Sequence, residues 1–167
     1  MKKLTLVING RGGVGKDTLC DVAATRYRVR NVSSITPIKQ LATVCGWGGE
    51  KTDKARRFLS ELKRITAEYN EYPTRWVTEE YRAFLESDEE ILFVHIREGE
   101  EIKKFVDATG GEARTLLIRA EARLGAHTYG NASDDLVEQY PYDYCFSNDD
   151  APTEAAERFL AFLADVF

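Results

Sequence analysis

The sequence predicts one α/β domain in which helices cover both faces of a five-stranded, mainly parallel sheet. Short apolar runs alternate with segments of helical period, and at least two of these runs are apolar enough for strands buried on both faces. A glycine-rich loop joins the first apolar run directly to a helical segment. We find no internal repeat or interdomain linker in residues 1–167, so we expect a single three-layer α/β/α domain.

Five runs have the composition of β-strands. The first runs from Leu4 to Ile8 and is uniformly apolar. The others are "RNVSSI" around Val32, "EILFVHI" from Ile91, "RTLLIRA" around Leu117 and "YDYCFS" around Cys145.

Helical segments separate these runs. They are "KDTLCDVAATRYR", "PIKQLATVCGW" with a proline suited to a first helical turn, "TDKARRFLSELKRITAEYN", "TRWVTEEYRAFLES" and the tail "TEAAERFLAFLADVF". The third places Phe58, Leu62, Ile65 and Tyr69 on one apolar face. We expect Thr153 to cap the final helix.

Composition argues against several classes of partner and site. The formal net charge is −5 with a pI of about 5.2 and no run of like charge, which disfavours binding to nucleic acid polymers or anionic membranes. Cys20, Cys45 and Cys145 have neither disulfide-framework nor zinc-ligand spacing. No segment approaches the roughly 20 apolar residues of a membrane span, and we expect a cytoplasmic protein.

The stretch "VINGRGGVGKDTL" nearly satisfies the phosphate-binding pattern G-x-x-x-x-G-K-[ST], with Gly10, Gly15 and Lys16 in place. It follows an apolar strand and opens a helix, which is the context that the pattern requires. The added glycines let backbone N–H groups turn inward around an anion. We therefore predict a P-loop that binds nucleotide phosphates, formed by Gly10, Arg11, Gly12, Gly13, Val14, Gly15, Lys16, Asp17 and Thr18.

Asp17 stands where the pattern has a hydroxyl, and it has two interpretations. An acidic residue in the first turn of a helix is favoured by the helix dipole whether or not a ligand is bound. Alternatively its carboxylate faces Mg²⁺, directly or through water, because this hard cation prefers oxygen ligands and keeps several waters. Thr18 keeps a hydroxyl nearby.

Three segments in this order resemble the deoxynucleoside monophosphate kinases, an adenylate-kinase-like group of P-loop kinases. They are "GKDT", then Pro37, Ile38 and Lys39 in a helix ending near Gly46 and Trp47, then "KTDKARRFLSELK" with Lys51, Asp53, Arg56 and Arg57. Animal phosphomevalonate kinases share the first two elements. The resemblance implies a P-loop NTPase fold that uses ATP and Mg²⁺, with acceptor-binding helices at about 37–88 and a lid at about 120–133.

Two later segments extend the resemblance. "FVHIREGEEIKKF" resembles the strand that ends in Asp-x-Arg in this family, with Arg97 and Glu101 matching and His95 in place of the aspartate. The aspartate helps to organise magnesium or the acceptor, so Asp17 would supply that charge here; His95 could equally be a buried imidazole bonded to backbone. The tail "YPYDYCFSND" resembles the turn against adenine, which assigns Asn148 to the nucleotide.

Phosphoryl transfer needs cations around the moving group, so arginines are the evidence to look for. Arg119 and Arg123 share a face if a helix begins at the end of the fourth strand, and with Lys16 they would contact the phosphates. Arg97 ends the third strand and would act in catalysis and acceptor binding. We assign Lys39, Arg57, Arg97 and Glu101 to the acceptor.

Acidic candidates for a general base are Glu98 and Glu101, although "REGEE" is equally a charged helix start. A phosphate acceptor needs no strong base. Asn131, Ser133, Asp134 and Asp135 resemble a helix cap after the lid.

These observations predict a kinase that moves the γ-phosphoryl group of ATP to a small phosphorylated acceptor, most simply a nucleoside or deoxynucleoside monophosphate. Phosphomevalonate or another small anion stays open. The departures at Asp17 and His95 leave a second class, a regulatory protein that binds ATP with little transfer. A GTPase-like switch is disfavoured because "SNDD" lacks the lysine of Asn-Lys-x-Asp.

Overall fold

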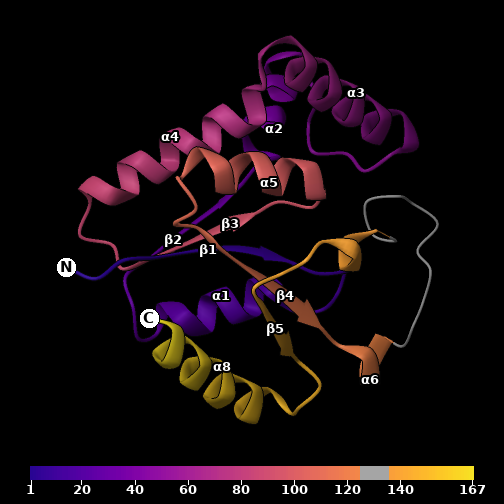
Figure 1. Cartoon of the computed structure of the whole chain (residues 1–167). Helices are drawn as coiled ribbons and strands as arrows, with labels where there is room; N and C mark the ends of the chain where they lie inside the picture. Colours follow the sequence, from indigo (N-terminus) through magenta and orange to yellow (C-terminus); the bar gives the residue numbers. More distant parts are fainter. Residues whose placement is uncertain (125–135) are drawn as a thin grey trace.

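A computed structural model describes residues 1–124 and 136–167, without the side chains of residues 123 and 124 (Figure 1). Its elements, in chain order, are β1 (Leu4–Asn9), α1 (Lys16–Ala24), β2 (Val29–Ser33), α2 (Thr36–Val44), α3 (Asp53–Asn70), α4 (Tyr72–Glu86), β3 (Ile91–His95), α5 (Gly99–Ala108), β4 (Arg114–Arg119), α6 (Glu121–Leu124), the 3₁₀ helix η1 (Val137–Gln139), β5 (Tyr144–Ser147) and α8 (Pro152–Val166).

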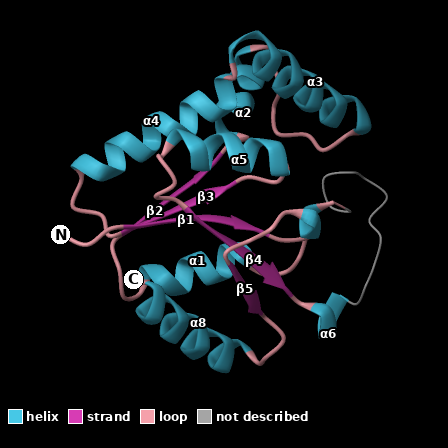
Figure 2. Ribbon diagram, in the orientation of Figure 1, coloured by secondary structure: helices cyan, strands magenta, loops and turns pink. Residues whose placement is uncertain are grey.

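The five predicted strands form one parallel sheet in the order β2-β3-β1-β4-β5, which confirms the predicted fold class (Figure 2). All six residues of β1 are buried, as expected for a central strand with a layer of helices on each side. Parallel pairing brings the carboxyl ends of all five strands to one edge of the sheet. The loop after β1 therefore opens at the edge where ligands of open α/β sheets bind.

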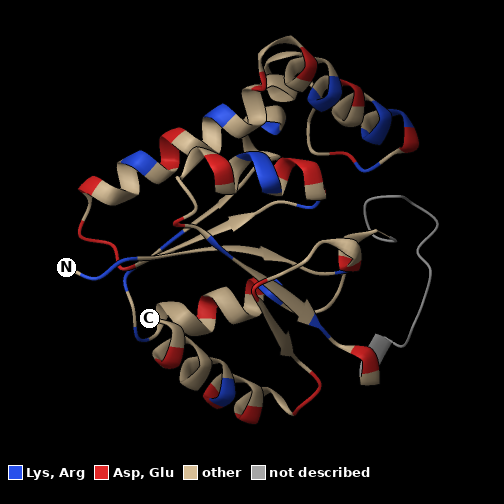
Figure 3. Cartoon of the chain, viewed as in Figure 1, with Lys and Arg blue, Asp and Glu red and all other residues tan. Residues whose placement is uncertain are grey.

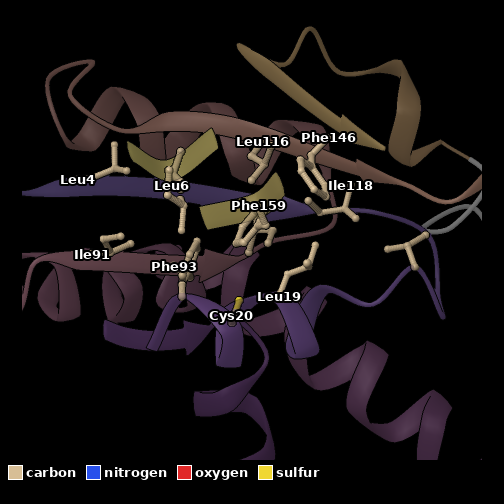
Figure 4. Packing of buried hydrophobic residues seen from close by; sticks show 14 of the residues in the cluster. Leu4, Leu6, Leu19, Cys20, Ile91, Phe93, Leu116, Ile118, Phe146 and Phe159 are labelled. Atoms are coloured by element: carbon tan, nitrogen blue, oxygen red, sulfur yellow. The ribbon is translucent and has the colours of Figure 1, made fainter. Parts of the chain in front are cut away.

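Two apolar clusters hold the layers together, one on each face of the sheet. α1 and α8 pack on one face, where Phe159 lies 5.1 Å from the ring of Phe146 and 6.5 Å from that of Phe93, measured between centroids (Figure 4). α4 and α5 supply buried residues to the other face, among them Phe84 and Phe105. Burying such rings contributes about 1.5–3 kcal/mol each.

The apolar face predicted for α3 is exposed instead of packed. Phe58 is 38% exposed, Ile65 49% and Tyr69 77%, and Ala55 is the only buried residue of the helix. α3 contacts α2 and α4 but lies beyond them, away from the sheet (Figure 1). Helical period groups these apolar residues on one face, but it cannot report whether another layer covers that face.

The start of the last helix also differs from the prediction. α8 begins at Pro152, with Ala151 as its N-cap residue, so Thr153 lies inside the helix. Proline is favoured at the first helical position, because the N–H that it lacks would have no hydrogen-bond partner within the helix at that position. Most of the predicted lid lies outside the described residues. The same holds for the predicted helix cap at Asn131, Ser133, Asp134 and Asp135. No helix among the described residues is long and apolar enough to cross a bilayer.

Gly10 makes the closest approach between the loop and the sheet. A Cβ added at this residue would lie 2.6 Å from the carbonyl oxygen of Ile118 and 2.7 Å from Cγ2 of Val14. The first of these atoms belongs to the backbone of a buried strand, which cannot move aside cheaply. The loop can pack here only because residue 10 has no side chain.

We therefore expect Gly10→Ala to lower the free energy of unfolding by about 1–3 kcal/mol, the usual cost of overpacking. The measurement is urea denaturation followed by circular dichroism. Gly12→Ala is the matched control, because a Cβ there meets nothing within 4 Å. Equal stabilities for the two variants would contradict the close-approach argument.

Candidate phosphate and acceptor site

Asn9 ties the loop after β1 to the neighbouring strands. Its side-chain Oδ1 accepts a hydrogen bond from the N–H of Gly10 at 2.9 Å. Its Nδ2 donates to the carbonyl of Arg97 at 3.0 Å and to the hydroxyl of Tyr142 at 2.9 Å. The start of the loop is thus held to the chain after β3 and to the segment before β5.

Two glycines turn the loop back onto α1. Gly13 has φ 83° and Gly15 has φ 92°, in the left-handed region that disfavours other residues. The side chain of Lys16 crosses the loop and donates to the carbonyl of Gly10 at 3.0 Å. This arrangement is able to hold phosphate oxygens at a helix N-terminus, with the lysine beside them.

Asn148, which follows β5, is hydrogen-bonded to the loop after β1. Its Nδ2 donates to the carbonyl of Val14 at 2.8 Å, and its backbone N–H donates to the carbonyl of Arg119 at 2.6 Å. The residue is buried, and it borders a 280 Å³ cavity that Gly15, Thr18 and apolar side chains of α8 also line. Asn148 therefore lies beside the loop, and its side-chain amide is hydrogen-bonded to the loop backbone.

A cavity of about 680 Å³ lies at the carboxyl ends of β1, β2 and β3 next to α2 and α3. Its volume is within the range of about 300–1,000 Å³ typical of small-molecule sites. Five cationic side chains line it: Lys16, Lys39, Arg56, Lys63 and Arg97. Asp17 and Glu98 are the two acidic residues of its wall. This cavity, which we call the basic cavity, suits an anionic ligand.

The structure brings four predicted residues together in the basic cavity: Lys16, Asp17, Lys39 and Arg97. Arg57 does not line it, whereas its neighbour Arg56 does. Arg56, Ser60 and Lys63 follow one another at the i, i+4 and i+7 positions of α3, so they share the face toward the cavity. One residue of offset turns Arg57 about 100° away.

Arg11 and Arg119 meet beside the loop through an acidic residue that the sequence analysis did not single out. Glu138, in η1, lies 3.1 Å from Nη2 of Arg11 and 2.7 Å from Nε of Arg119. Arg119 also pairs with Glu121 and does not line the basic cavity. It ends β4 and α6 begins at Glu121, so the predicted shared helix face with Arg123 is wrong, and the side chain of Arg123 lies outside the described residues.

Asp17 and Thr18 face different cavities. Asp17 lines the basic cavity, whereas Thr18 lines the smaller cavity beside Asn148. Of these two neighbouring residues, the one that borders the basic cavity is therefore the acid and not the hydroxyl. The described residues contain no group of three or more His, Cys, Asp or Glu side chains able to hold a metal ion. One carboxylate suits Mg²⁺ that arrives with phosphates and water, because this ion rarely needs an all-protein cage.

His95 is a partly buried residue of the basic cavity. Its Nε2 lies 2.7 Å from Oδ1 of Asn31 and 3.8 Å from Sγ of Cys20. Burial lowers the pKa of His95 to about 4; nearby Asp17 opposes this shift, while Lys16 and Arg97 add to it. The imidazole is thus neutral at pH 7, and its bonding partner is a side chain of β2.

Lys63 is a further residue that the sequence analysis missed. Its Nζ lies 2.8 Å from Oε2 of Glu98 and 2.9 Å from Oε2 of Glu101. Burial opposes its charge, but the two carboxylates raise the pKa of Lys63. Glu101 does not line the basic cavity and is instead a partly buried partner of Lys63. The repeated spacing of Arg56, Ser60 and Lys63 was the available sequence signal.

Charges elsewhere are mixed in sign. Figure 3 shows basic and acidic residues interspersed along α3, α4 and α5. Arg64, for example, pairs with Glu61 and Glu68 on the surface of α3. The basic cavity therefore differs from the surrounding surface in its excess of cations.

No family model matches the sequence, and no curated protein matches it. Solved structures do resemble the fold. A tunicamycin resistance protein from Deinococcus radiodurans has a TM-score of 0.59 at 15% identity, with 97% of this chain and 96% of that chain covered. A sugar kinase from Janibacter sp. HTCC2649 has a TM-score of 0.55 at 16% identity, with coverages of 97% and 95%.

A gluconokinase from Sinorhizobium meliloti 1021 has a TM-score of 0.52 at 17% identity, with 98% of this chain and 93% of that chain covered. At such identities the likeness establishes the fold alone, a parallel α/β fold that this chain shares with the three structures. The chain spans nearly the whole length of these structures.

The pKa of His95 predicts how stability varies with pH. The folded protein keeps the ring neutral down to about pH 4, whereas an unfolded chain binds a proton near pH 6.5. Stability is therefore lost as pH falls below about 6.5, by up to about 2 kcal/mol at pH 5. We expect His95→Gln to flatten this part of the profile, measured by urea denaturation at pH 7.5, 6 and 5. An unchanged slope would contradict the assignment.

Proposed function

We propose that this protein is an ATP- and Mg²⁺-dependent phosphotransferase whose acceptor is a small phosphorylated molecule, a nucleoside or deoxynucleoside monophosphate. The observation that carries the proposal is the position of the basic cavity directly beside the phosphate-binding loop, with Lys16 and Asp17 belonging to both. A donor phosphate on the loop and an anion in the cavity would therefore be neighbours. The P-loop kinase fold supports this proposal without identifying the acceptor.

In the proposed reaction, N–H groups of the loop hold the donor phosphates and Lys16 exchanges the carbonyl of Gly10 for a phosphate oxygen. Lys39, Arg56 and Arg97 hold the acceptor phosphate, and Asp17 would hold the metal directly or through water. Mg²⁺ neutralises charge on the phosphates when bound. An acceptor oxygen bonds to the γ-phosphorus as the bond to the β–γ bridging oxygen breaks, and ADP leaves with the electron pair.

This reaction requires no strong base, because the attacking oxygen of a phosphate is already anionic near pH 7. A neutral His95 is consistent with that requirement, since it neither repels the cations nor adds charge. Arg11, Arg119 and Arg123 belong to the donor side in this proposal, with Arg11 and Arg119 joined through Glu138. The small cavity beside Asn148 and Thr18 is our candidate for the adenine ring.

Non-nucleotide acceptors form the nearest alternative within the same class. Two of the similar structures are a sugar kinase and a gluconokinase, and phosphomevalonate suits a basic cavity equally. Five cationic side chains against two carboxylates favour an acceptor with more than one negative charge. A regulatory protein that binds ATP without transferring its phosphoryl group would differ from a kinase only in showing no turnover of ATP with any acceptor.

The test is ATP consumption with saturating Mg²⁺ and a panel of ribo- and deoxynucleoside monophosphates, phosphomevalonate and gluconate. We expect turnover confined to the nucleotides. Protection against heat by ATP without turnover on any acceptor would favour the regulatory alternative.

Arg56 and Arg57 offer a matched pair of variants. We expect Arg56→Ala to raise the KM for the acceptor about tenfold or more, because it removes a cation from the cavity wall. Arg57→Ala should change that KM less than about threefold, because Arg57 does not line the cavity. Steady-state kinetics with varied acceptor give the comparison, and a larger effect at Arg57 would reverse our assignment.

Asp17→Asn tests the role of the acidic residue in the loop. If the carboxylate helps to hold Mg²⁺, the variant needs at least several-fold more Mg²⁺ for half-maximal activity. The comparison uses Mg²⁺ titrations at fixed ATP. Unchanged magnesium dependence and turnover would leave only the stabilising interaction with the helix dipole.

A further inference from the structure

A lysine of α3 and two glutamates at the start of α5 form an ion-pair cluster at one side of the basic cavity. Lys63 of α3 lies between Glu98, which precedes α5, and Glu101 in the first turn of α5. The side chain of Lys63 is 20% exposed and that of Glu101 is 12% exposed. We call these three residues the Lys63 cluster.

The Lys63 cluster separates two cavities. Lys63, Glu98 and Ser60 line both the basic cavity and a second cavity of about 400 Å³. The second cavity is more acidic, because Glu71, Glu100 and Glu101 also line it, beside Arg64 and a Lys104 that pairs with Glu71 at 3.0 Å. A ligand that extends from the basic cavity toward the second one therefore passes from a wall with an excess of cations to a wall with four carboxylates and three cations.

The length of α3 matches this change in charge. Arg56 and Lys63 share the cavity face and are seven residues apart, which is roughly 10 Å along a helix. A ligand of nucleotide size with its phosphate near Lys16 and Arg56 would bring its other end to Lys63 and Glu98. That end is the base of a nucleoside monophosphate.

The carboxylate of Glu98 can bond only to hydrogen-bond donors. The pKa of Glu98 is lowered, because Lys63 outweighs the effect of burial, so this carboxylate stays ionised and accepts hydrogen bonds. Each of its oxygens has more than one lone pair and can accept a ligand N–H beside its other bonds. Oε1 of Glu101 is buried without a hydrogen-bond partner among residues 1–124 and 136–167.

We propose that the Lys63 cluster reads the base of the acceptor, with Glu98 accepting a hydrogen bond from an exocyclic amino group while Lys63 and Glu101 hold its carboxylate in position. This inference rests on the proposed function and names its substrate class: nucleoside monophosphates with an amino-substituted base. A base with a carbonyl at the same place is disfavoured, because two acceptors face each other and the carboxylate loses its partner.

The test compares dCMP with dUMP and dAMP with dIMP, since each pair differs by an amino group against a carbonyl. We expect kcat/KM with ATP to favour the amino member of at least one pair by about tenfold or more. Glu98→Gln should reduce that preference to within about threefold, because a neutral amide presents a donor as well as an acceptor. Glu100→Gln, on the same turn but outside the basic cavity, should keep it.

Each outcome has a distinct meaning. Transfer to all four nucleotides at similar rates overturns this inference and leaves the proposed function intact, whereas transfer to none overturns both. In Glu98→Gln, kcat/KM could instead rise equally for both members of a pair. That result would show that Glu98 only masks the charge of Lys63, and it would also overturn this inference. Thermal melting of the variants checks that they fold. Glu101→Gln is the second variant, and it should partly weaken the preference for the amino-substituted base.

Discussion

Gly10 lets the loop after β1 pack directly against the backbone of β4, and the geometry of the candidate site depends on this approach. Because the loop lies so close to Ile118, Lys16 can reach back to the carbonyl of Gly10. Asn148 can then brace Val14 from β5, while Asn9 ties the loop to the end of β3 through Arg97. A loop held on three sides keeps its N–H groups in place before a phosphate arrives, which is the preorganisation that electrostatic catalysis requires.

The parallel order of the strands converts this local arrangement into a site. β1 lies between β3 and β4, so residues that follow β3 come to lie beside the loop. Arg97 reaches the basic cavity in this way, and α2 and α3 add Lys39 and Arg56 from above. The cations thus come from four separate parts of the chain, and a phosphorylated acceptor is the ligand that would use them together.

Sequence patterns predicted the features that depend on residues close together in the chain. All five strands and the turn into α1 follow from apolar runs and glycine spacing, and Lys16, Asp17, Lys39 and Arg97 do lie in one cavity. Pairings between distant segments were beyond the sequence. Glu138 against Arg11 depends on how η1 returns to the loop, and Asn31 against His95 depends on the register of β2 and β3. Whether Arg56 or Arg57 lines the cavity depends on how α3 is rotated about its axis. α3 contacts α2 and α4, and its apolar residues Phe58 and Ile65 stay exposed, so its apolar face does not predict this rotation.

The central claim is that the loop and the basic cavity act together to move a phosphoryl group. The most direct measurement is ³¹P NMR of the protein with MgATP and an equimolar mixture of deoxynucleoside monophosphates, with Lys16→Ala as the control. Our account predicts resonances of ADP and of a deoxynucleoside diphosphate that grow together in the wild type and grow at least about 100-fold more slowly in the variant. Formation of ADP and inorganic phosphate alone, or no change in the spectrum, would contradict it.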